Sequence, residues 1–169
     1  MGVCRKQPTK FIVNLGELMA YIKILTIPDE TLRKPSKPVT AFDASLHELL
    51  ADMQETLRHY DGVGLSAVQI GVLKRVFIID IGNGVTEYIN PTIVSFSGKQ
   101  KGNEGCLSIP NEWHKVTRPN KVTIQFYDRN GAMHTETYQG LQARAVFHEN
   151  DHLNGILYTD YVKKQKSEM

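Results

Sequence analysis

The chain of 169 residues, 41% of them hydrophobic, is long enough for one substantial core and too short to make two ordinary domains the default. Its 20 basic and 18 acidic residues leave a net charge of +2, which predicts no specific nucleic-acid binding. No apolar run is long enough to cross a membrane, and two cysteines in unrelated contexts indicate a reducing compartment rather than a disulfide framework.

Residues 1–18 are basic and precede Met19, where a better-patterned segment begins. We expect 1–18 to be an N-terminal extension, either vector-derived or a leader, because the stretch lacks the serine and arginine richness of a typical transit peptide. Residues 19–169 are expected to form a single domain.

The first part of this domain alternates between extended and helical patterns. Residues 21–27 are apolar and β-branched, which predicts a strand, and the prolines that follow predict an extended loop over 28–38 without a helix. Leucines at helical spacing over 43–61 predict an amphipathic helix with Asp43 as its N-cap.

The second part is rich in strands and closes with a helix. Residues 97–105 are expected to be a loop, and 141–154 a helix followed by Gly155 as its C-terminal glycine. This order, without βαβ alternation, predicts an α+β domain in which antiparallel sheets pack around the C-terminal helix. The strands are expected over 75–81, 89–96, 121–128 and 132–138.

An H-E-x-x-H sequence lies within that last helix. His148 and His152 are four residues apart, so both imidazoles share one face and can bind one cation, while Glu149 is placed to accept a proton from activated water. The plain alternatives are a solvated helix or a buried structural histidine. Helical spacing predicts that Leu141, Ala145 and His148 lie on a buried face, and that Asp151 is exposed.

A catalytic site of this kind needs a third protein ligand. The position at which some zinc proteases carry a third histidine is Tyr158, which excludes that pattern. Glu168 lies beyond a basic stretch, 163–166, that we expect to be frayed. Cys106 lies in a loop of small residues and is either the third ligand or a small buried hydrophobe.

Residues 62–69 (GVGLSAVQ) form a glycine-rich block. Its glycines allow close approach of a bound peptide, and Gln69 offers a donor without a competing charge, although the block also fits a simple helix-to-strand turn. It imitates a dinucleotide-binding fingerprint, but a helix precedes it where that fingerprint requires a strand.

Three blocks together resemble the peptide deformylases, in the order typical of that family: 62–69, 104–108 (EGCLS) and 148–152 (HENDH). The similarity extends over most of 19–161. It implies a metal-dependent hydrolase that removes the N-formyl group from the formyl-methionine of newly made polypeptides and releases formate. The implied location is the bacterial cytoplasm near the ribosome, or an organelle if residues 1–18 are a leader, and the implied state is a monomer.

The same resemblance implies roles for individual residues. The metal is one divalent ion, natively Fe(II), with Zn, Ni or Co as substitutes, and its ligands are Cys106, His148 and His152. Glu149 transfers the proton, and the Gln69 amide and the Leu107 N–H hold the formyl oxygen. Substrate backbone pairs with the segments at Val63, Gly64 and Gly105. The methionine side chain lies against Val63, Leu141, Ala145 and the edge of His148, and Glu104 pairs with Arg118.

Three positions depart from the usual family pattern: Ser66, Phe147 and Arg144. Arg144 lies one turn before His148 and is expected either to crowd the pocket with charge or to extend to its rim. Trp113 is expected at the pocket mouth or in the core. Two rival functions remain, a metallopeptidase that cleaves internal peptide bonds and a non-catalytic relative that binds N-termini if Arg144 blocks catalysis.

Overall fold

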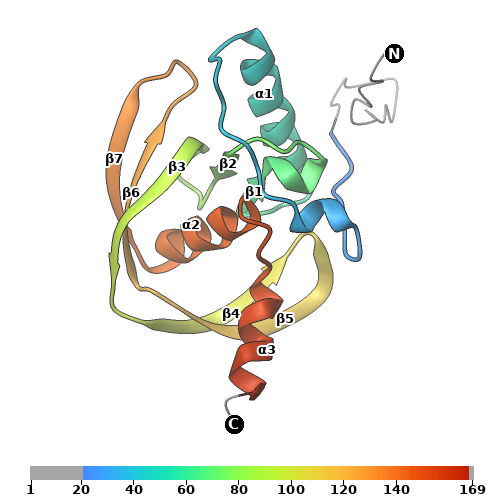
Figure 1. Ribbon diagram of the computed structural model, residues 1–169, viewed down its shortest axis with the longest axis vertical. Helices are drawn as coiled ribbons and strands as arrows, with labels where there is room; N and C mark the ends of the chain where they lie inside the picture. Colours follow the sequence, from blue (N-terminus) through green and yellow to red (C-terminus); the bar gives the residue numbers. More distant parts are fainter. Residues whose placement is uncertain (1–20, 168–169) are drawn as a thin grey trace.

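The computed structural model describes residues 21–167, so the predicted extension at 1–18 lies outside the described residues. Five strands form one antiparallel sheet in the order β1-β2-β3-β6-β7, and β4 pairs with β5 in a separate two-stranded sheet. Figure 1 shows α2 in the middle of the molecule, with strands around it, α1 above and α3 below. The α+β class, with antiparallel sheets around a helix near the C-terminus, is confirmed.

The helices are α1 (Ala44–His59), α2 (Gly140–His152) and α3 (Tyr158–Ser167), with short 3-10 helices η1 (Glu30–Arg33) and η2 (Ala67–Ile70). The strands are β1 (Gly64–Ser66), β2 (Val76–Ile79), β3 (Thr86–Ser97), β4 (Gln100–Cys106), β5 (Ile109–Arg118), β6 (Lys121–Tyr127) and β7 (Met133–Gln139).

Strand β2 is buried on both faces, and this divides the core into two parts. Val76 and Ile78 belong to the cluster that contains the buried face of α1, whereas Phe77 and Ile79 belong to the cluster that contains α2. Successive side chains of a strand point to opposite faces, so one continuous apolar run serves both clusters. The large sheet therefore separates α1 from α2 and supports α2 from one side.

Both long helices predicted from the sequence are present. Helix α1 begins after Asp43, whose carboxylate accepts a hydrogen bond from the Leu46 N–H, as expected of an N-cap. Helix α2 ends at His152, two residues earlier than expected, and Gly155 adopts φ +71° in the turn that follows. Within 21–167, no helix is long and apolar enough to cross a membrane.

The strand expected at 21–27 is wrong: this described segment forms no continuous strand. The backbone N–H groups of Ile22, Leu25 and Ile27 bond to three separate parts of the chain. Their acceptors are Thr56 Oγ1 at 3.0 Å, the Gln69 carbonyl at 2.7 Å and the Ser108 carbonyl at 3.0 Å. The apolar, β-branched composition reflects burial here, and the backbone bonds are made with loops and side chains instead of a ladder.

The helix-free loop expected at 28–38 is also wrong, because η1 lies within it. Asp29 caps this 3-10 turn by accepting from the Thr31 N–H at 2.8 Å. Leu32 is fully buried, which fixes the turn against the rest of the protein. Prolines on both sides of a four-residue turn do not prevent it, because none lies inside it.

The segment expected to be a loop at 97–105 is largely strand β4, and its partner β5 was not predicted. Their register, from Gln100 opposite Arg118 to Cys106 opposite Ile109, forms a hairpin closed by a two-residue turn. Polar residues and glycines hide the alternation that would reveal a strand. The stretch 163–166, expected to be frayed, has helical backbone as part of α3.

Helix α1 offers a matched pair of leucines for testing which face carries the stability. Leu50 is fully buried, whereas its neighbour Leu49 is only partly buried at the edge of the same cluster. We predict that Leu50→Ala lowers the free energy of unfolding by about 2–5 kcal/mol, because it removes buried methyl groups and leaves a cavity. Leu49→Ala should cost clearly less in the same chemical denaturation series. Equal losses would contradict the assignment of the buried face.

Candidate metal centre

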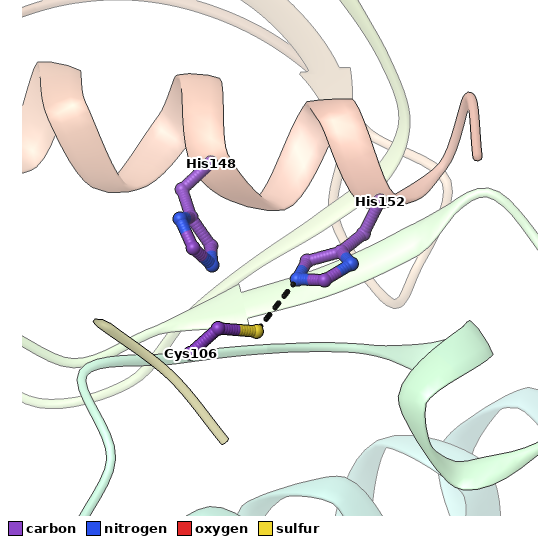
Figure 2. Close-up of side chains that lie close together, drawn as sticks. All are labelled: Cys106, His148 and His152. Carbon is purple, nitrogen blue, oxygen red and sulfur yellow. Dashed lines mark hydrogen bonds between the residues drawn. The ribbon is translucent and has the colours of Figure 1, made fainter. Parts of the chain in front are cut away.

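The three predicted metal ligands lie together between α2 and the end of β4. Figure 2 shows His148 and His152 extending from the same side of α2 toward Cys106, and Cys106 Sγ lies 3.3 Å from His152 Nε2. One ligand atom from each residue lies within 4.8 Å of the other two. The sequence spacing places the histidines on one helix face, and only the fold brings Cys106 to them. One thiolate and two imidazoles form a donor set that suits Fe(II) or Zn(II).

The two imidazoles have opposite electrostatic surroundings. Burial lowers the pKa of His152 well below its usual value, and the proximity of His148 lowers it further, so this ring is neutral and able to act as a ligand. Burial acts on His148 in the same direction, but hydrogen bonding with Cys106 and Glu104 raises its pKa to about 10. The negative groups that favour a proton on His148 also favour a cation beside it.

Glu104 holds the His148 ring from behind. His148 Nδ1 lies 3.1 Å from Glu104 Oε2, which leaves Nε2 to face the ligand cluster. The predicted pair with Arg118 is confirmed, with Nε and Nη2 donating to the two carboxylate oxygens at 2.9 and 3.0 Å. Burial would raise the pKa of Glu104, but hydrogen bonds from His148 and Arg118 outweigh it and lower the pKa to about 2. Glu104 is therefore a buried, permanently charged acceptor.

Arg144 neither leaves an unpaired charge in the pocket nor extends to its rim. Its side chain is buried, and Nη1 donates to Glu104 Oε1 at 2.7 Å. The guanidinium also bonds to backbone carbonyls at Gln100, Gly102 and Val116, at 3.2–3.4 Å. This residue therefore ties α2 to the β4–β5 hairpin. The rival function in which Arg144 blocks catalysis loses its physical basis, because the charge is fully paired.

The Glu149 side chain is held by Ser66 at the end of β1. The Ser66 hydroxyl donates to Glu149 Oε2 at 2.7 Å and lies 3.0 Å from its carbonyl oxygen. A Cβ atom at Gly64 would clash with Glu149 Oε1 unless that carboxylate moved, so glycine allows this close approach. Burial raises the pKa of Glu149, although His148 and the Ser66 hydrogen bond oppose the shift. A carboxylate in these surroundings can accept and return a proton.

Gln69 is buried and held at both ends of its amide. Its Oε1 accepts from the Ser66 N–H at 2.8 Å, and its Nε2 donates to Ser108 Oγ at 3.1 Å and lies 3.7 Å from Cys106 Sγ. Leu107 lies in the turn between β4 and β5, directly after Cys106. An amide donor and the backbone at Leu107 thus lie beside the ligand cluster.

A cavity of about 700 Å³ opens beside this cluster, and Cys106 and His148 line it. Trp113 is 71% exposed and covers Gly105 at the cavity mouth, which is one of the two positions expected for it. The buried position expected for Leu141 is wrong: this side chain is 58% exposed, because it lies in the first turn of α2 at the rim. The cavity is lined by Val63, Gly64, Gln69, Gly105, Cys106, Leu107, Leu141, Ala145, His148 and Glu149, among others.

Asp151 is a site residue that sequence reasoning placed wrongly. It was expected to be exposed, but only 8% of it is accessible. Its carboxylate accepts from Arg118 Nη1 at 2.5 Å and from the Tyr161 hydroxyl at 2.9 Å. Helical periodicity does not reveal this burial, because its partners come from β5 and α3. Ser66 was noted in the sequence only as a departure from the family pattern, and its contact with Glu149 was not foreseen.

Comparisons with known proteins agree with this geometry. The polypeptide deformylase family matches residues 21–168 of the chain. A peptide deformylase of Caldicellulosiruptor bescii is 50% identical over 89% of this chain and 90% of its own length. Peptide deformylase 1 of Bacillus subtilis is 45% identical over 89% of this chain and 95% of its own length. The crystal structure of a peptide deformylase from Legionella pneumophila matches with a TM-score of 0.81 and 43% identity, covering 86% of this chain and 90% of the other.

The chain belongs to the peptide deformylase family. It is therefore an enzyme, a metal-dependent hydrolase that removes the N-formyl group from newly made polypeptides. Family membership and this activity agree with what the three sequence blocks imply, and the α+β fold agrees with the prediction made from the order of strands and helices. In this deformylase, Cys106, His148 and His152 form a group that could hold a metal ion.

The buried ion pairs around Arg118 provide a test of how much they hold this region together. We predict that Arg118→Met lowers the free energy of unfolding by about 3–5 kcal/mol, because Glu104 and Asp151 are then left buried without the cation that they share. Arg58→Met is the matched control, since the Arg58 side chain is 58% exposed. It should cost under about 1 kcal/mol in the same denaturant titration. A loss at Arg118 no larger than at Arg58 would contradict this reading.

Proposed function

We propose that Cys106, His148 and His152 hold one divalent metal, natively Fe(II), with Zn, Ni or Co as functional substitutes. The observation that carries this proposal is the gathering of the three ligand atoms within 4.8 Å of one another beside the cavity. The thiolate favours iron and zinc over harder ions such as Mg²⁺. When bound, the metal supplies Lewis-acid chemistry and lowers the pKa of water at the site.

We infer that Glu149 is the proton-transfer group. Its carboxylate accepts a proton from the water whose oxygen attacks the formyl carbon. As the C–N bond breaks, the same carboxyl group gives the proton to the amine nitrogen of methionine, and formate leaves. Burial supports this role because it raises the pKa of Glu149 above its ordinary value, and Ser66 supports it by fixing the carboxylate.

We propose that Gln69 Nε2 and the Leu107 backbone N–H hold the formyl oxygen as negative charge develops on it. Donors of this kind contribute most when they are fixed before the reaction, because no reorganisation is then needed. Gln69 meets this condition, since Ser66 and Ser108 fix both ends of its amide.

The cavity supports a proposal for how the substrate lies. An extended peptide pairs its backbone with the chain at Val63, Gly64 and Gly105, and the methionine side chain lies among Leu141, Ala145 and the edge of His148. Val63 and Leu141 are large apolar side chains with 44% and 58% exposure. A methionine side chain would cover this surface, which favours an apolar first residue.

We also propose that the enzyme acts as a monomer in the cytoplasm, close to the ribosome. The proposed location rests on the substrate, because formyl-methionine is carried by polypeptides at the start of their synthesis. The similar peptide deformylases of Caldicellulosiruptor bescii and Bacillus subtilis are bacterial, which supports a bacterial setting.

Exchange of Glu149 separates proton transfer from metal binding. We predict that Glu149→Gln lowers the rate of formate release from a formyl-Met peptide by about 10²–10⁴-fold while metal content is unchanged. Glu136→Gln, the same chemical change at an exposed position of β7, should keep normal activity. Near-normal formate release by Glu149→Gln would refute the proposed mechanism. Cleavage of an internal peptide bond by the wild-type protein would instead favour the metallopeptidase alternative.

Exchange of Cys106 tests the third ligand. We predict that Cys106→Ser lowers the zinc and iron content of the purified protein, because a hydroxyl replaces a soft thiolate. Metal analysis of anaerobically prepared protein measures this directly. Ser108→Ala is a suitable control, since its hydroxyl bonds to Gln69 and is not a proposed ligand. Unchanged metal content in Cys106→Ser would remove Cys106 from the centre.

A further inference from the structure

A buried polar chain leads from helix α3 to the metal centre. The Tyr161 hydroxyl donates to Asp151 Oδ2 at 2.9 Å, and the same oxygen accepts from Arg118 Nη1 at 2.5 Å. Arg118 then holds both oxygens of Glu104, which contacts His148 Nδ1 at 3.1 Å. Asp151, Arg118 and Glu104, which link Tyr161 to the His148 ring, are all buried, so water does not readily replace a lost partner.

Tyr161 makes two contacts at the start of this polar chain. Its hydroxyl donates a hydrogen bond to Asp151, and the centroid of its ring lies 4.4 Å from the Arg118 guanidinium carbon. A cation over an aromatic face is held more strongly when both are removed from water. Tyr161 therefore fixes the position of Arg118 from two directions, and Arg118 in turn fixes the carboxylate that orients His148.

Helix α3 also packs behind the cysteine of the centre. Leu157 and Tyr158 form a buried cluster with Ile109 and Val116 of β5, and Cys106 packs against this cluster. In Figure 1, α3 follows α2 directly and lies against β5. The helix thus contacts both elements that carry proposed metal ligands, α2 through Asp151 and the β4–β5 hairpin through the apolar cluster.

The docking of α3 has further anchors outside this polar chain. Arg33 of η1 binds both carboxylate oxygens of Asp160, at 2.6 and 3.0 Å. The aromatic ring of Tyr158 is also buried, and its hydroxyl donates to the Glu112 carbonyl at 3.0 Å. Loss of one hydroxyl from Tyr161 should therefore leave α3 docked, which allows its effect on the centre to be measured separately.

We propose that Tyr161 is a positioning residue for the metal ligand His148, acting through Asp151, Arg118 and Glu104, and that docking of α3 and metal binding strengthen each other. The proposal rests on the ligand set given above. Coupling between two sites is reciprocal, so a helix that tightens the metal must itself be tightened by the metal. Tyr161 touches neither substrate nor metal and acts only on the orientation of the ring.

Metal release from the variant Tyr161→Phe tests the first half of this proposal. The protein is loaded with Zn²⁺, and transfer of the ion to a colorimetric chelator is followed in time, alongside the affinity. Direct outer-shell partners of ligands typically contribute 10–100-fold to metal affinity, and Tyr161 is further away, so we expect a loss of about 3–10-fold. Tyr158→Phe, which removes a hydroxyl from the same helix outside the polar chain, should stay within about twofold of wild type.

Hydrogen exchange of the α3 amides tests the reciprocal half. In the wild type, Zn²⁺ should slow exchange over 158–167, and this protection should shrink in Tyr161→Phe but persist in Tyr158→Phe. A purely structural role for Tyr161 predicts faster exchange with and without metal by the same factor. The double variant with Asp151→Asn should lose little more of this protection than Tyr161→Phe alone, because both substitutions interrupt the same series of polar contacts.

The outcomes separate this proposal from the one on which it rests. If His148→Ala binds Zn²⁺ as tightly as wild type, the proposed metal centre is wrong. If His148→Ala loses the ion but Tyr161→Phe releases it at the wild-type rate, the centre stands and the coupling is overturned. Equal losses in Tyr161→Phe and Tyr158→Phe would also overturn it, because general loosening of α3 would then explain both.

Discussion

The buried carboxylate of Glu104 is the interaction on which the organisation of the centre depends. It lies between Arg118, Arg144 and His148, which come from β5 and α2, while Glu104 itself belongs to β4. A carboxylate removed from water is costly unless it is paired and hydrogen-bonded, and here both conditions are met by three partners. This one group therefore sets how α2 and the β4–β5 hairpin meet, and it orients a proposed metal ligand at the same time.

Neutral hydrogen-bond donors hold the two other proposed catalytic side chains, Glu149 and Gln69. Ser66, at the end of β1, fixes the Glu149 carboxylate through its hydroxyl and the Gln69 amide through its backbone N–H. The proposed proton-transfer group and the proposed oxyanion donor are thus held by one residue. Because α2 lies between the two sheets, each sheet supplies support to a different side chain of the H-E-x-x-H sequence.

Much of this arrangement was predictable from local pattern. The four-residue spacing of His148 and His152 requires only that the segment be helical, and the helix predicted over 141–154 is present as α2. Strand β2 was predictable because a continuous apolar run of its length is buried on both faces. The strand predicted at 21–27 failed for the converse reason, since composition reports burial but not where the backbone hydrogen bonds are made.

The sequence by itself determined the family of this protein, through the H-E-x-x-H sequence, the cysteine-containing block and the glycine-rich block. Only the tertiary structure decided how these groups are supported. Arg144 is paired instead of obstructive, Asp151 is buried instead of exposed, and Tyr161 of the last helix bonds to Asp151. The reason is that motif residues are spaced by local geometry, whereas the burial and charge of their supports depend on partners far apart in the chain.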